Sequence, residues 1–152
     1  MEFIALLLTS FLFGGMLLFS VGFGSLCFKF LEPSVARVFI RKTFPYFYNY
    51  VLFVSTLIFL FSFNISKVAA ALAFSVFITT IPASKIVMPA INKASDARQK
   101  RKFVFLHTLS VFITVFHIII CGALLYIIFM PWLFSPLREI YLNWLRLQNR
   151  RS

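Results

Sequence analysis

Four apolar runs dominate this sequence, and each is long enough to cross a lipid bilayer. They cover about residues 3–28, 44–63, 68–91 and 103–130, and Lys85 is the only charged side chain in them. An α-helix needs roughly 20 mostly apolar residues to cross a hydrocarbon core ~30 Å thick. The sequence therefore predicts an all-α fold, an integral membrane four-helix bundle, with one transmembrane domain over residues 1–130.

The composition supports a membrane protein. Hydrophobic residues make up 61% of the chain, and the mean hydropathy is +0.95. A soluble domain is nearer ~45–50% apolar. The first run could be mistaken for a secretion signal, but it lacks the positive N-terminal region of a signal and is too long. We expect it to be a retained helix.

The basic residues are unevenly distributed along the chain. Two predicted loops, 29–42 and 92–102, hold nine of them, whereas the second loop and the tail hold five: Lys67, Arg138, Arg146, Arg150 and Arg151. Because cytoplasmic loops carry an excess of lysine and arginine, we expect both basic loops in the cytoplasm. We expect a multi-pass protein located in the bacterial cytoplasmic membrane.

Residues 131–152 predict a different kind of segment. Pro131 is expected to end the fourth helix, and Ser135 and Pro136 resemble the start of a new one. Apolar residues of 137–148 fall mostly on one helical face, and charged or amide side chains fall on the other. The pattern predicts an interfacial amphipathic tail that lies on the membrane surface. A helix that docks on a partner protein is the alternative.

A polar stripe marks the fourth predicted helix. At 100° per residue, five side chains fit an arc of about 80°: His107, Ser110, Thr114, His117 and Cys121. Such a stripe should face the bundle or a second chain rather than lipid. The two histidines are roughly 15 Å apart along the helix, so they cannot ligate one haem iron from both sides. We expect no metal and no other cofactor.

Polar residues also gather at the predicted cytoplasmic end. They suggest a pocket for an anionic headgroup or a small solute, formed by Lys29, Lys85, Asn92, Asp96, His107 and Ser110. The alternative is that Lys85 extends to the membrane surface and that the other side chains cap helices or contact water.

The sequence favours binding over catalysis. It contains no serine nucleophile elbow, phosphate-binding glycine loop or metal motif, so we expect no enzyme. The preferred function is a non-enzymatic protein that binds lipid, a small solute or another membrane subunit. The alternative is a small oligomeric transporter or channel-like protein, although no acidic residue lies well inside a span. A haem-binding membrane subunit is the third possibility.

The expected partners follow from the charge. The net charge of +11 lies mostly beside the membrane and suits anionic lipid headgroups. A second copy of the chain or another membrane subunit is also expected, and nucleic acid is not.

Two stretches carry a family resemblance: LCFKFLEPSVARVFIRKTFPYFYNY and VMPAINKASDARQKRKFVFLHTLS. Over about residues 10–125 the chain resembles a domain-of-unknown-function family of small four-helix membrane proteins that includes the transmembrane protein 205-like proteins. The motifs are Phe28-Lys29, Phe44-Pro45-Tyr46-Phe47, Pro89, Asp96, and Phe103 with His107 and Ser110. The resemblance implies a four-helix integral membrane protein with Lys29, Pro45, His107 and Ser110 at motif positions, and it implies no particular activity.

Overall fold

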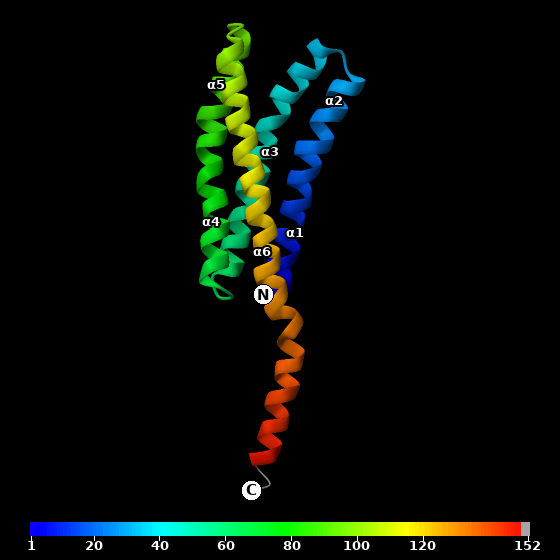
Figure 1. Cartoon of the computed structure of the whole chain (residues 1–152), viewed down its shortest axis with the longest axis vertical. Coiled ribbons are helices and arrows are strands. Elements are labelled where there is room, and N and C mark those ends of the chain that lie inside the picture. The colour runs from blue at the N-terminus through cyan, green and yellow to red at the C-terminus, as the bar shows by residue number, and fades with distance from the viewer. Residues whose placement is uncertain (150–152) are drawn as a thin grey trace.

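A computed structural model describes residues 1–149 as a bundle of helices joined by short turns (Figure 1). The elements in chain order are α1 (Glu2–Leu17), the π-helical turn η1 (Leu18–Phe23), α2 (Gly24–Phe30), α3 (Pro33–Ser62), α4 (Lys67–Pro82), the π-helical turn η2 (Ala83–Val87), α5 (Met88–Asp96) and α6 (Lys100–Asn149).

Four stretches of helix are long and apolar enough to span a membrane: Glu2–Phe30, Pro33–Ser62, Lys67–Asp96 and Lys100–Met130. This confirms the predicted all-α class and the four spans. A helix of about 30 residues is ~45 Å long, which exceeds the ~30 Å hydrocarbon core. The helix ends therefore reach the headgroup level.

The helices extend further toward the basic end than the sequence suggested. α3 begins at Pro33 and not at residue 44, so most of the expected first loop is helical. Pro33 occupies the first turn, where its missing N–H group leaves no bond unmade. Pro45 comes directly after the expected start of this span at residue 44, yet it lies inside α3. A membrane helix tolerates the one backbone hydrogen bond that an internal proline removes.

The third span contains a π-helical turn between two prolines. η2 follows Pro82 directly, and Pro89 lies in the first turn of α5. Each proline removes a backbone donor, and the Met88 N–H group bonds to the Ala83 carbonyl, five residues back. The span changes its winding here without being interrupted.

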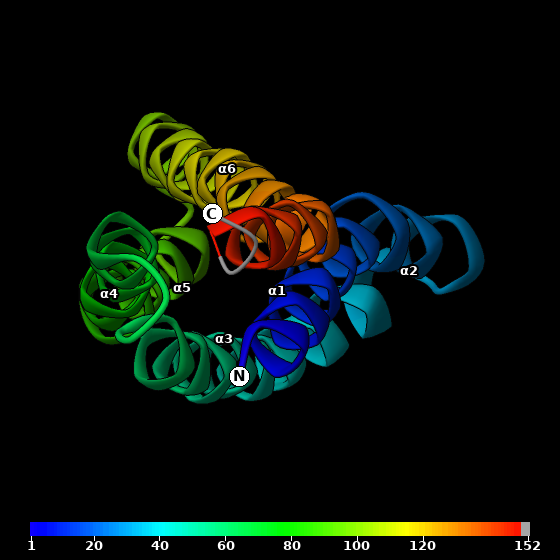
Figure 2. The same ribbon diagram turned by 90° about the horizontal axis from the view of Figure 1, so that it is seen from below.

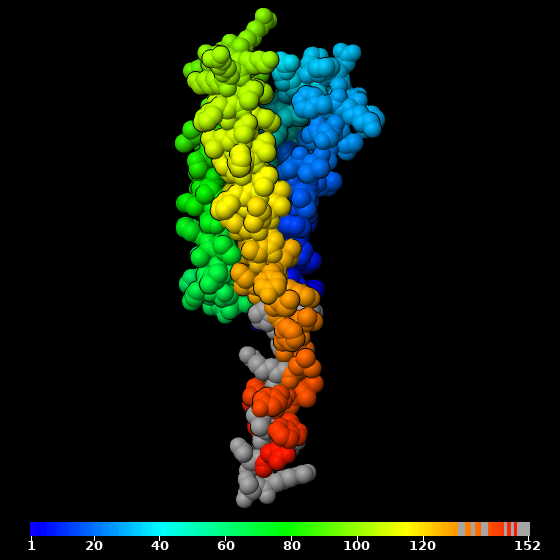
Figure 3. Space-filling view, viewed as in Figure 1, coloured from blue at the N-terminus to red at the C-terminus, as the bar shows by residue number. Residues whose placement is uncertain are grey.

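The fourth span continues past its predicted end. α6 runs through Pro131 to Asn149, so the prediction that Pro131 ends the helix is wrong. A proline removes only one donor, and the surrounding PWLFSP sequence contains no glycine to turn the chain. The last part of α6 projects beyond the bundle (Figures 1 and 3). Its position on the membrane surface stays a prediction.

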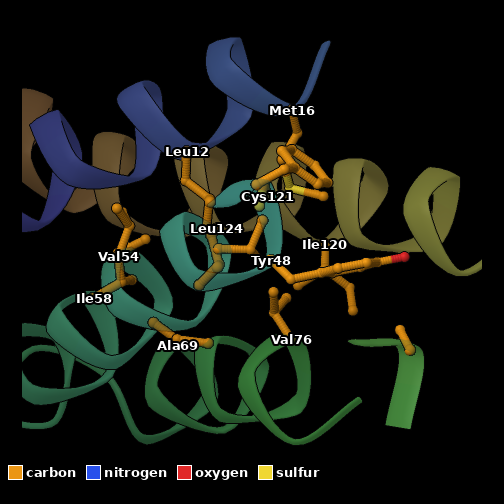
Figure 4. Close-up of a cluster of buried hydrophobic side chains, with 14 of the residues drawn as sticks. Leu12, Met16, Tyr48, Val54, Ile58, Ala69, Val76, Ile120, Cys121 and Leu124 are labelled. Carbon is orange, nitrogen blue, oxygen red and sulfur yellow. The ribbon is translucent and has the colours of Figure 1, made fainter. Parts of the chain in front are cut away.

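The tightest packing lies in the half of the bundle away from the basic loops. Side chains from α1, α3, α4 and α6 meet there, and Figure 4 shows Leu12, Met16, Ile58 and Leu124 among the largest of the fully buried ones. Toward the basic end the packing loosens, since η1 buries no residue and α2 buries only Cys27. The fold therefore combines a packed half with an open half.

Candidate functional site

The open half contains a cavity of about 860 Å³. η1 and α2 line one side, the N-terminal half of α3 lines another, and α5 and the start of α6 complete the wall. Seen along the bundle, α2 reaches away from α4 and α5 (Figure 2). Ligand pockets for small molecules usually enclose ~300–1,000 Å³, so this cavity has room for a single amphiphile.

The deeper wall of the cavity is apolar and rich in aromatic rings. Phe19 of η1 stacks on Phe47 of α3, with ring centroids 4.1 Å apart and an angle of 6° between the planes. The Phe44 and Phe19 rings are nearly perpendicular, with centroids 5.3 Å apart, and Val115 and Ile118 of α6 complete this part of the wall. Such a surface suits a hydrocarbon chain and offers it few polar partners.

The cavity opens sideways, at the level of the membrane spans. Val21 and Phe28 on one wall are 67% and 62% exposed, and Val111 and Val115 of α6 are 46% and 47% exposed. A residue that lines a cavity and is also exposed marks an opening. Because these four are apolar and belong to helices able to span a membrane, the rim of the opening is apolar.

Basic side chains surround the cavity at the loop end. Arg37 and Arg41 lie one turn apart on α3, and Arg98 and Lys100 come from the turn before α6 and its first residue. Arg41 donates two hydrogen bonds to the Asp96 carboxylate, at 2.7 and 3.1 Å. Within residues 1–149, the side chains of Arg98 and Lys100 form no hydrogen bond or ion pair. The mouth of the cavity therefore carries positive charge that Asp96 only partly neutralises.

A few polar groups other than lysine and arginine lie between the basic mouth and the apolar wall. His107, Ser110 and Thr114 line the cavity from α6, and Asn92 lines it from α5. His107 is exposed, and its ring stacks on Phe103 with centroids 5.7 Å apart. The Asn92 amide contacts the Met88 sulfur at 3.3 Å. These groups can accept or donate hydrogen bonds to the neck of an amphiphile.

Three of the predicted pocket residues do not line the cavity. Lys85 is exposed because the buried residues of its turn, Ala83 and Val87, define the opposite face of the helix. Lys29 is also exposed, with its ammonium group 5.6 Å from the Phe30 ring. Asp96 lies at the edge of the cavity, where it pairs with Arg41.

The polar stripe of α6 divides into two environments. His107, Ser110 and Thr114 line the cavity, whereas His117 and Cys121 are buried in the packed half. His117 Nε2 lies 2.7 Å from the Thr79 hydroxyl of α4, so this histidine joins two helices.

Sequence reasoning missed the arginines of α3 and the aromatic wall. Arg37 and Arg41 have the i, i+4 spacing of one helical face, but their segment was expected to be a loop. The stacked rings of Phe19 and Phe47 could not be paired without knowing how η1 and α3 cross.

Comparison with known proteins yields one match. No curated protein and no solved structure matches the chain. One family model, described as Domain of unknown function (DUF4149), matches residues 7–100, which is more than half of the sequence. The match includes the cavity walls from η1, α2, α3 and α5, and it ends where α6 begins. The chain therefore belongs to the family described as Domain of unknown function (DUF4149).

Proposed function

We propose that the protein binds one anionic membrane lipid in this cavity and acts by binding rather than by catalysis. The observation that carries the proposal is the pairing of an apolar, ring-lined wall with a basic mouth. The two ends of the cavity match the two ends of a lipid, with hydrocarbon against Phe19 and Phe47 and an anionic headgroup near Arg37 and Arg98. Arginine is well suited to the oxygens of a phosphate or carboxylate.

The lipid enters from the bilayer in this proposal. The side opening between Val21 and Phe28 and, across from them, Val111 and Val115 would admit an acyl chain without passage through water. A lipid that moves from the membrane into the cavity exchanges one apolar environment for another, so its acyl chain contributes little to selectivity. The headgroup interactions should therefore determine which lipid binds.

Several finer features belong to the same proposal. The basic end faces the cytoplasm, where anionic headgroups attract juxtamembrane lysine and arginine. The membrane is the bacterial cytoplasmic membrane, and the family is the one that includes the transmembrane protein 205-like proteins. A second copy or another membrane subunit packs against the bundle, and nucleic acid is not a partner.

Two glycines provide a matched test. Gly24 lines the cavity, and a Cβ added there meets no atom within 4 Å. Gly14 is equally unobstructed, but it is outside the cavity. Gly24→Phe should fill the cavity beside its opening, and Gly14→Phe should add the same ring to the outer surface of α1.

The measurement is native mass spectrometry of delipidated protein titrated with phosphatidylglycerol or with phosphatidylcholine. We expect wild type and Gly14→Phe to retain one phosphatidylglycerol in preference to phosphatidylcholine, and Gly24→Phe to retain little. Equal binding of the two lipids by wild type, or equal binding by the two variants, would refute the proposal.

A further inference from the structure

We infer that Arg98 is the residue that selects the headgroup, through direct hydrogen bonds to a phosphate. This inference rests on the proposed lipid binding and adds to it a specificity-determining side chain. Three observations carry it: the backbone conformation of Arg98, its place at the cavity mouth, and the lack of a partner for its side chain within residues 1–149.

The turn between α5 and α6 has the geometry that ends many helices. The Gln99 N–H group bonds to the Ala94 carbonyl at 2.9 Å, and the Arg98 N–H group bonds to the Ser95 carbonyl at 3.2 Å. This pair of bonds places Arg98 in the left-handed region, with φ of 53°. Glycine is the usual residue at this position, because a Cβ atom is disfavoured there.

The turn itself gives no reason for an arginine. Glycine would form the same two backbone bonds without steric strain, and asparagine also tolerates the conformation. A residue held in a sparsely populated conformation points to a role for its side chain. Arg98 lines the cavity, so that role is available at the mouth.

The other basic residues at the mouth are less suited to this role. Arg41 is already bound to Asp96 through both of its terminal nitrogens, and Arg37 interacts electrostatically with the same carboxylate. Lys100 lacks a partner within residues 1–149, but an ammonium group is a point charge and does not match phosphate oxygens in pairs. Arg98 combines a planar set of donors with a side chain that no acidic residue binds in the part of the chain that the structure describes.

Arg98→Gly separates the binding role from the structural one. The variant removes the guanidinium and relieves the strain, so its melting temperature in detergent should rise while its affinity for phosphatidylglycerol should fall about tenfold. The matched control is Arg101→Gln, since Arg101 is an exposed cation of the same segment that does not line the cavity. This control should bind within about twofold of wild type, because screened surface charges contribute little.

Three outcomes distinguish the role of Arg98 from lipid binding itself. If Arg98→Gly and Arg101→Gln bind phosphatidylglycerol like wild type, the role of Arg98 is refuted and the lipid proposal stands. If wild type itself does not prefer phosphatidylglycerol over phosphatidylcholine, the lipid proposal fails. If Arg98→Gly does not fold, Arg98→Asn provides the same comparison, because asparagine tolerates the left-handed conformation and also lacks the guanidinium.

A soluble probe distinguishes a lipid headgroup from a free phosphate compound. Glycerol 3-phosphate carries the phosphate without acyl chains, and it should compete poorly for the site because the apolar wall contributes nothing to its binding. Displacement of phosphatidylglycerol by a similar concentration of glycerol 3-phosphate would overturn the assignment of a lipid ligand.

Discussion

The Asp96 carboxylate accepts two hydrogen bonds from the Arg41 guanidinium, at 2.7 and 3.1 Å, and the pair joins α5 to α3 beside the cavity mouth. Both side chains remain accessible, with Asp96 63% and Arg41 35% exposed. An exposed pair of this kind contributes little to stability. Its larger effect is electrostatic, because Asp96 places a negative charge beside the cations that would bind an anionic headgroup.

Asp96→Asn should therefore strengthen binding of an anionic lipid. The substitution removes the competing charge and leaves Arg41 free to contact the headgroup, while the melting temperature should change little. Titration with phosphatidylglycerol, followed by native mass spectrometry, should give an affinity severalfold higher than wild type, and the gain should shrink at high salt. Glu2→Gln is the control, since it removes the same charge near the start of α1. Equal gains in both variants would indicate a general effect of net charge.

Gly15→Ala should destabilise the packing of α1 on α3. A Cβ at Gly15 would collide with the Tyr50 hydroxyl and lie 2.9 Å from Tyr50 Cζ, and that hydroxyl donates a 2.6 Å hydrogen bond to the Phe11 carbonyl. Overpacking of this kind typically costs about 1–3 kcal/mol, which thermal unfolding in detergent would detect. Gly14→Ala, where the added Cβ meets nothing within 4 Å, should be neutral or slightly stabilising. A lower melting temperature for Gly14→Ala than for Gly15→Ala would contradict the packing.

Thr79→Val should loosen the contact between α4 and α6. The Thr79 hydroxyl donates to the Ser75 carbonyl at 2.6 Å, so it is an acceptor for His117 Nε2–H at 2.7 Å. Valine leaves that buried donor unpaired, with an expected loss of about 1 kcal/mol in unfolding free energy. Thr80→Val is the control, because among the described residues the Thr80 hydroxyl bonds only to the Val76 carbonyl of its own helix. Losses of the same size in both variants would show that the bond between helices contributes nothing.

The last part of α6 provides a test of its predicted place on the membrane surface. Trp144 is exposed, and Trp132→Phe leaves it as the only tryptophan in the chain. If the tail lies at the interface, acrylamide should quench Trp144 much less in vesicles containing phosphatidylglycerol than in a detergent that carries no charge. Equally strong quenching in both would place the tail in water and remove the interfacial assignment.

The fold could be predicted from the sequence because each span has a strong and local signal. Four uncharged or nearly uncharged runs fix the number of helices, since few other structures satisfy the backbone in lipid. The helix ends were harder to predict. Boundaries were expected at residue 44 and at Pro131. Pro45 and Pro131 nevertheless both lie within helices, because a single lost hydrogen bond does not force a helix to end.

The site was only partly accessible to sequence reasoning. Asn92, His107 and Ser110 were assigned to a pocket, and all three line the cavity. Lys85 was grouped with them by depth alone, and depth does not say which way a helix turns its side chain. Arg98 and the aromatic wall border the same cavity because of the way η1, α3 and α6 diverge. This is a tertiary property that no local pattern encodes.

The most direct test of lipid binding is a structure of the protein determined in nanodiscs that contain phosphatidylglycerol. We expect density for one lipid whose acyl chain enters between η1 and α6 and lies against Phe19 and Phe47, with its phosphate within hydrogen-bond distance of Arg98. Helices closed over an empty space, or ordered lipid found only on the outer surface of the bundle, would contradict the account.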